Sequence, residues 1–141
     1  DEFIDYDVNP SITLSIDSLY FSNDLDRLLR NLKSIKNNRM YLFYSQYVFD
    51  EISGDRTVLC SNKTRIADVL NRNEISFDVV DYSDNERFLY ENGLRVMRKY
   101  EKAFEEEGNT DLYLNKLKED MMGRTLYDKG LARRYLYIVE E

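Results

Sequence analysis

The side chains best suited to chemistry in this sequence are those of Cys60, the only cysteine, and Lys63, three residues later. The thiolate is the nucleophilic form of cysteine, and a neighbouring ammonium group or a helix N-terminus lowers the pKa of the thiol. If a helix begins near this pair, Cys60 is a candidate nucleophile and Lys63 the residue that activates it. The alternative is that Cys60 is a small, partly buried side chain, because free cysteine packs as an apolar residue.

The residue types that the sequence lacks exclude several classes of active site. It contains no histidine, which removes Ser-His-Asp triads, Cys-His pairs and metal sites built on imidazole. A single cysteine forms neither an intramolecular disulfide nor a cysteine-based zinc site, and it favours a reducing cytoplasmic or nuclear compartment. The acidic pair Glu119 and Asp120 is a poor metal candidate, since adjacent helical residues do not share a face. We therefore expect no metal ion and no cofactor.

A formal net charge of −7 argues against nucleic acid or an anionic membrane as the main partner. Against that acidic background, four basic residues gather near the C-terminus and predict a docking patch for an acidic protein partner. A solvated surface without a partner is the alternative. The four residues are Arg124, Lys129, Arg133 and Arg134.

A leucine stripe is a second candidate contact surface. Four leucines fall at helical spacing in the segment 23–35, where they form either part of the core or a dimer contact. The 12 tyrosines allow a similar choice, because tyrosine is favoured both at protein interfaces and at the edges of a core. The leucines of the stripe are Leu25, Leu28, Leu29 and Leu32.

Hydrophobic periodicity divides the chain into an acidic arm or linker over residues 1–22 and one α/β domain over residues 23–141. A short alternation of apolar and polar residues at 12–16 has the period of a strand. Ser83 and Glu86 have the spacing of a capping box at the start of a long helix. The expected elements are helices at 23–35, at 61–72, from 83 to about 107 and from 110 to about 122, and strands at 40–49, 75–81 and 135–139.

The segment from residue 40 to residue 81 has the length of one strand–helix–strand crossover. Such a unit places its two strands side by side and parallel, with the helix packed on the sheet. We therefore predict that 40–49 and 75–81 are neighbouring parallel strands.

The same segment resembles glutaredoxin. In that family an aromatic and aliphatic strand leads into a Cys-Pro-Tyr-Cys or Cys-Gly-Phe-Ser loop at a helix N-terminus, and a strand ending in aspartate follows. The matching parts here are Tyr41–Ser45, Cys60–Lys63 and Phe77–Asp81. Residues 85–92 are also similar to the SH3-binding glutamic-acid-rich branch, which has lost redox activity.

This resemblance implies a thioredoxin-like mixed sheet flanked by helices, with an N-terminal helical extension. Lys63 replaces the second cysteine of the family motif, so the resemblance does not extend to dithiol chemistry. The cis-proline that faces the cysteine in the family also has no counterpart, because Pro10 is the only proline. Without that fixed bond the site for glutathione is not preorganised, and glutathione is not an expected ligand.

The chain is further similar to the glutaredoxin-like domains that end fungal polarisome scaffolds, which promote actin filament assembly. That similarity implies a non-catalytic homodimer that binds actin and cooperates with a formin, in the cytoplasm and cell cortex at sites of polarised growth. A monothiol oxidoreductase acting through Cys60 and a small adaptor of unrelated α/β topology are the alternatives. The acidic start without an initiator methionine indicates no signal peptide and predicts a fragment of a longer protein.

Overall fold

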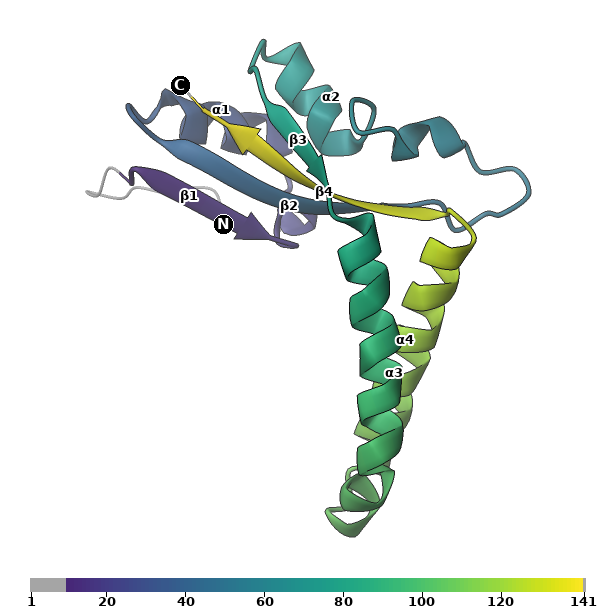
Figure 1. Cartoon of the computed structure of the whole chain (residues 1–141). Helices are drawn as coiled ribbons and strands as arrows, with labels where there is room; N and C mark the ends of the chain where they lie inside the picture. The colour runs from purple at the N-terminus through teal and green to yellow at the C-terminus, as the bar shows by residue number, and fades with distance from the viewer. Residues whose placement is uncertain (1–9, 141) are drawn as a thin grey trace.

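In the computed structural model four strands form one mixed sheet, and two helices cover one face of it (Figure 1). Two longer helices leave the sheet at one end and project away from it. The structure describes residues 10–140. The strands are β1 (Ile12–Ile16), β2 (Arg39–Tyr47), β3 (Asp78–Asp81) and β4 (Ala132–Val139), and the helices are α1 (Leu25–Ser34), α2 (Arg65–Arg72), α3 (Ser83–Glu106) and α4 (Thr110–Asp128).

The strand order in the sheet is β1-β2-β4-β3. Strands β1 and β2 are parallel, whereas β4 is antiparallel to both of its neighbours, β2 and β3. The prediction of a mixed α/β domain is confirmed. The predicted pairing of 40–49 with 75–81 is wrong, because β4 lies between β2 and β3. The strand–helix–strand unit with adjacent parallel strands is instead formed by β1, α1 and β2.

The sheet includes part of the segment that the sequence assigned to an acidic arm. Strand β1 pairs with β2 along its whole length of five residues. Leu19, which follows in a short 3-10 helix (Leu19–Phe21), is buried in the core. The folded domain therefore begins before residue 23, and residues 1–9 of the predicted arm lie outside the described residues.

The main core lies between the sheet and helices α1 and α2. Successive side chains of a strand face opposite sides, so every second residue of the two central strands points into this core. Helix α2 is held at its N-terminus by Thr64, whose hydroxyl accepts a hydrogen bond from the Ala67 N–H at 3.3 Å and lies 2.6 Å from the Tyr137 hydroxyl. The central strands contribute Met40, Leu42, Tyr44, Tyr135, Tyr137 and Val139 to the core.

Helices α3 and α4 form an antiparallel hairpin, and Gly108 at the turn has a φ of +73°, a conformation that favours glycine. The predicted capping box at the start of α3 is not formed. The Ser83 hydroxyl accepts a hydrogen bond from the Arg134 N–H at 3.0 Å, and the Glu86 carboxylate accepts one from the Arg134 guanidinium. The Asp81 carboxylate accepts from the Ser83 N–H instead, at 2.8 Å, so α3 is fixed to the end of β3 and to β4.

Candidate interaction surface

The face of the sheet opposite α1 and α2 carries apolar side chains over which no described helix lies. Cross-strand pairing aligns these side chains in rows, because residues paired in register point to the same face. One row runs through Leu14, Tyr41 and Ile138, and the next continues from Ile16 to Val80. We call this set the open face: Ile12, Leu14, Ile16, Tyr41, Phe43, Val80, Leu136 and Ile138.

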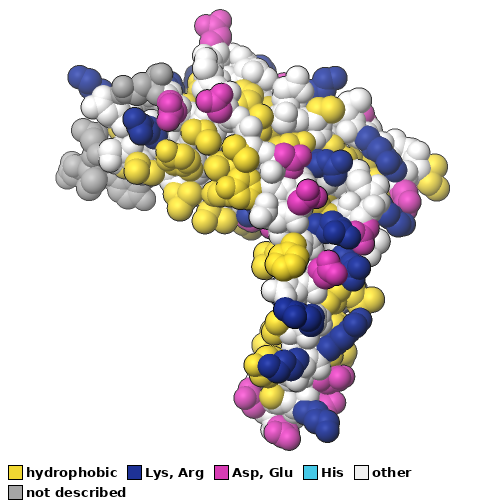
Figure 2. Space-filling model, viewed as in Figure 1, with side chains coloured by type: hydrophobic (Ala, Val, Ile, Leu, Met, Phe, Trp, Pro, Cys, Tyr) yellow, Lys and Arg dark blue, Asp and Glu magenta, His cyan; other side chains and the backbone are white. Residues whose placement is uncertain are grey.

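The open face is most exposed along its edge strand. Ile12 and Leu14 are each 60% exposed and Ile16 is 57% exposed, although all three are large aliphatic residues. In Figure 2 hydrophobic side chains gather over β1 and β2. Leu136, in the middle of the set, is buried, so the exposed apolar surface lies mainly along β1. Exposed apolar surface of this kind is typical of interaction sites. Among the described strands, none pairs with the outer side of β1, which is an edge of the sheet and therefore a place where a further strand can add.

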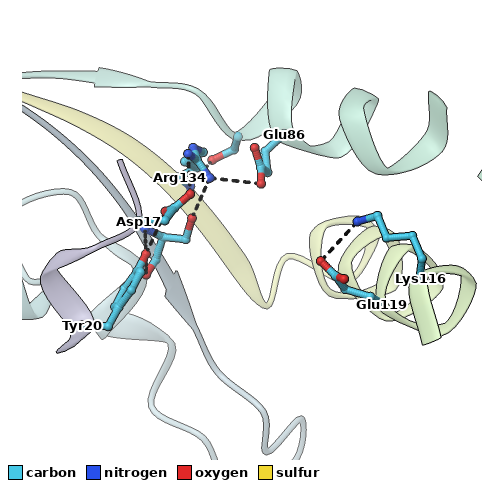
Figure 3. A network of polar contacts seen from close by, with 8 residues as sticks. Asp17, Tyr20, Glu86, Lys116, Glu119 and Arg134 are labelled. Carbon is cyan, nitrogen blue, oxygen red and sulfur yellow. Dashed lines mark hydrogen bonds and ion pairs between the residues drawn. The ribbon is translucent and has the colours of Figure 1, made fainter. Parts of the chain in front are cut away.

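A polar network borders the open face where the sheet meets the hairpin (Figure 3). The Arg134 guanidinium lies 2.7 Å from the Asp17 carboxylate, which follows β1, and 3.1 Å from the Glu86 carboxylate in the first turn of α3. It also lies 3.3 Å from the Ser45 hydroxyl of β2 and over the Phe43 ring, 5.8 Å from its centroid. Arg134 thus connects β1, β2, β4 and α3 at one point.

Tyr20 supports this network from the β1 side. Its hydroxyl accepts a hydrogen bond from the Ser45 N–H at 2.5 Å and lies within 3.2 Å of the Asp17 carboxylate. Its ring packs on Tyr44, with centroids 4.7 Å apart. Burial raises the pKa of the Tyr20 phenol, so the hydroxyl stays protonated and remains a hydrogen-bond donor. The position of Asp17 next to Arg134 is therefore fixed by the fold.

The charges in this network attract each other strongly, because two of them are largely removed from water. The side chains of Arg134 and Glu86 are each 12% exposed. Burial raises the pKa of Glu86, and the nearby Arg134 charge only partly offsets that rise. Burial would lower the pKa of Arg134, but Glu86 and Asp17 outweigh it and raise the value. The guanidinium remains charged, and its role is to hold the elements together rather than to transfer protons.

The four predicted docking residues do not form one free basic patch. Arg134 is held in the network just described, and Arg133 on the next position of β4 points to the opposite face. Arg124 pairs with Asp128 at 3.4 Å, and Lys129 pairs with a loop residue, Glu51, at 2.6 Å. Three of the four positive charges are thus paired within the chain, and the docking role of these residues stays a prediction.

Of the two roles predicted for the leucine stripe, core or dimer contact, the structure shows the core role. Leu25, Leu29 and Leu32 are buried between α1 and the sheet, and Leu28 packs against the same cluster as a partly buried residue. Because these side chains are covered by their own chain, they are not available as a dimer contact.

Cys60 is exposed, but it does not lie at the N-terminus of a helix. It follows a 3-10 helix (Arg56–Leu59), and α2 begins only at Arg65 with Thr64 as its cap. Lys63 contributes its backbone N–H to a turn with the Cys60 carbonyl at 2.8 Å. The helix terminus on which the proposed activation of Cys60 depended is therefore occupied by Thr64.

The acidic pair on α4 is divided between two environments. Asp120 is buried and lies 2.9 Å from the Lys116 ammonium, whereas Glu119 is exposed and lies 3.3 Å from the same group. Within residues 10–140, no group of three or more histidine, cysteine, aspartate or glutamate side chains is placed to hold a metal ion. Both carboxylates of the pair are therefore ion-pair partners of Lys116.

Sequence reasoning did not identify the open face as a contact surface. The alternation at 12–16 gave the strand period, but the position of that strand at the sheet edge depends on pairing with β2. The roles of Asp17 and Glu86 likewise became visible only through their contacts with Arg134.

Searches with this sequence match no protein-family model and no curated protein. Among the described helices, none combines the length and the apolar character needed to cross a membrane.

Proposed function

We propose that this chain is a non-catalytic protein-interaction and self-association domain of a cytoskeletal scaffold. The observation that carries the proposal is the open face, a rigid sheet surface with aliphatic side chains that are more than half exposed along β1. Its border is fixed by the Arg134 network, so the surface is preorganised for binding. Preorganisation lowers the entropy cost of association.

Self-association through the open face has a simple geometry. Two such faces related by a twofold axis present the same patch to each other, and sheets pack face to face at a separation of about 10 Å. Covering the open faces of two copies would bury on the order of 1,000 Å² in total, near the lower limit for a specific interface. A homodimer of moderate affinity is the expected product.

Actin is the partner that we propose for this domain, on the basis of the resemblance to polarisome scaffold domains. A formin and the scaffold itself complete the proposed assembly, which would act in the cytoplasm and at the cell cortex during polarised growth. The mixed four-stranded sheet is consistent with the thioredoxin-like arrangement that the resemblance implies. Strands β2 and β3 are not neighbours, which is not the pairing that the glutaredoxin resemblance led us to expect. The glutaredoxin relationship is therefore proposed on the sequence motifs alone.

Co-sedimentation with actin filaments tests this function. The wild-type domain should pellet with filaments, and the variant Leu14→Lys/Ile16→Lys should bind at least about tenfold more weakly, because it places two charges in an apolar contact. Ile52→Lys is the matched control, since Ile52 is 98% exposed in a loop away from the open face. If no form of the domain pellets with filaments, actin is not the partner. If the double variant pellets as the wild type does, the open face is not the binding site.

A glutathione-disulfide reduction assay separates this proposal from the monothiol alternative. We expect no turnover above background for the wild-type domain, and the same result for Cys60→Ser. Turnover that Cys60→Ser abolishes would replace the interaction proposal by an enzymatic one.

A further inference from the structure

Strand β1 is one of the two edges of the sheet, and its pairing with β2 shows which of its main-chain groups face outward (Figure 1). The Arg39 N–H donates to the Ser11 carbonyl at 3.0 Å, and the Asp17 N–H donates to the Phe43 carbonyl at 3.4 Å. In a parallel ladder every second residue of a strand bonds to the same neighbour. The residues in and beside β1 that bond to β2 are therefore the odd-numbered ones.

The even-numbered residues of β1 direct their N–H and C=O groups to the outer side. These residues are Ile12, Leu14 and Ile16, whose aliphatic side chains are more than half exposed on the open face. We call these outward main-chain groups the β1 edge. A row of main-chain donors and acceptors next to a row of exposed aliphatic side chains is matched by one kind of ligand, an extended strand with aliphatic side chains at alternate positions.

The β1 edge lacks the features with which proteins protect a sheet edge from further pairing. The opposite edge, β3, is only four residues long and has Asp78 and Asp81 at its two ends. Short strands and charged side chains of this kind prevent unintended pairing. Strand β1 is five residues long and contains neither a charged residue nor a proline. The hydroxyls of its polar residues, Thr13 and Ser15, are engaged in hydrogen bonds within the chain.

We propose that the β1 edge binds an extended segment of another protein, which adds to the four-stranded sheet as an antiparallel strand. In an antiparallel pair, two residues directly opposite each other can exchange both main-chain hydrogen bonds, and their side chains point to the same face. The residue opposite Leu14 bonds to its N–H and C=O, and an aliphatic side chain at that position extends the apolar surface of the open face. Antiparallel pairs are more common than parallel pairs and slightly more stable per residue.

Another protein is a better occupant than a second copy, because the proposed self-association already uses a twofold contact between open faces. Pairing of two β1 edges would add a second twofold contact. Two such contacts close into a finite assembly only when their axes intersect at special angles, and otherwise they extend into an open chain. A strand of another protein fills the edge without extending the assembly. The choice of occupant thus rests on the proposed function, whereas strand pairing at the β1 edge does not.

Fluorescence anisotropy with a designed strand peptide tests this inference. The labelled peptide is Thr-Val-Thr-Val-Thr-Val-Thr with a lysine at each end. In one form every valine carries an N-methyl group, and in the other every threonine does, so each form lacks the N–H groups of one of its two edges. In the antiparallel arrangement the valine N–H groups face β1. The valine-methylated peptide should therefore bind at least about tenfold more weakly than the threonine-methylated peptide.

Two variants of Leu14 separate the main-chain contact from the side-chain contact. Leu14→Pro removes an N–H that faces the outer side rather than β2, a position at which edge strands tolerate proline. Leu14→Ala keeps that N–H and shortens the side chain. The proline variant should bind the threonine-methylated peptide at least about tenfold more weakly than the alanine variant, and circular dichroism should show both folded. The comparison of the two peptides uses only wild-type protein, so it holds even if a variant fails to fold.

Equal binding of the two methylated peptides would overturn the proposal, as would equal binding by the two folded Leu14 variants. Light scattering of the free domain tests the occupant. If Leu14→Pro loses self-association and Leu14→Ala keeps it, the β1 edge pairs with a second copy and the proposal is wrong. A wild-type domain that stays monomeric but binds the peptides in the expected order would contradict the proposed self-association and support strand pairing at the β1 edge.

Discussion

At the scale of single residues, Arg134 makes the most consequential contacts in the structure. It joins Asp17 and Glu86, two carboxylates that both precede it by long stretches of chain, and it packs on Phe43 of the open face. A guanidinium serves this purpose better than an ammonium, because its planar fork reaches several acceptors at fixed angles. The network therefore sets both the stability of the junction and the shape of the surface beside it.

Replacement of Arg134 by alanine should destabilise the domain by about 2 to 3 kcal/mol, because it leaves the buried Glu86 carboxylate without its partner. The double variant Arg134→Met/Glu86→Leu should recover much of that loss, since it removes both charges. Arg133→Ala, the neighbouring control, should change stability by less than about 0.5 kcal/mol. Urea unfolding measures all three. Equal losses for Arg133→Ala and Arg134→Ala would contradict the role assigned to the network.

Glu86 gives the network a pH dependence of defined sign. Burial raises its pKa above the ordinary value of 4.5, so the folded protein binds this proton more tightly than the unfolded chain. The stability that Glu86 contributes is therefore largest at acid pH and is lost as the pH rises through the folded pKa. The melting temperature of wild type minus that of Glu86→Gln should increase as the pH falls from neutral to about 4. A difference that decreases over this range would mean that the folded-state pKa is lowered instead.

At the scale of elements, the hairpin depends on two glycines that admit large side chains from the opposite helix. Gly93 of α3 lies against the Asp120 carboxylate of α4, and Gly123 of α4 lies against the Tyr90 ring of α3. Helix α4 consequently continues through Gly123, where sequence reasoning ended it. At this position the absence of a side chain serves helix packing rather than helix termination.

Gly123→Ala tests this close approach. The added Cβ would lie 2.6 Å from ring carbons of Tyr90, so either the ring or the helix must move. We expect a net loss of about 1 to 2 kcal/mol, because overpacking exceeds the gain in helix propensity. Asn115→Ala, at an exposed position of the same helix, should gain a few tenths of a kcal/mol, about the propensity difference. A Gly123→Ala protein more stable than the wild type in urea unfolding would exclude this packing.

Most elements could be predicted from local periodicity, but their pairing could not. The apolar spacing of α1, α2 and α3 and the aromatic run of β2 each carry their own signal. The insertion of β4 between β2 and β3 depends on contacts between residues 54 to 99 positions apart, for which no local pattern exists. The prediction of adjacency for 40–49 and 75–81 failed for that reason.

The candidate surface was less predictable than the elements. Arg134 was named as a basic residue, yet its burial follows from Glu86 and Asp17, which only the folded chain brings together. The alternation at 12–16 indicated a strand, but which of its two faces would remain open depends on where α1 and α2 pack. Exposure is a property of the assembled sheet, and a single strand does not encode it.

At the scale of the whole molecule, the sheet has one covered face and one open face, with a hairpin projecting from one end (Figure 1). This arrangement separates two surfaces of different character. The open face is apolar and suited to a second sheet, whereas α4 carries a separate, shallow apolar surface that includes Leu114, Met121 and Met122.

The most direct test of the open face is the molar mass of the domain by light scattering over a range of concentrations. We predict that the mass of the wild-type protein rises from the monomer value of 16.9 kDa towards twice that value with concentration. The variant Leu14→Lys/Ile16→Lys should remain at the monomer mass, and Ile52→Lys should behave as the wild type. A wild-type protein that stays monomeric at every concentration, or a double variant that still associates, would contradict the account.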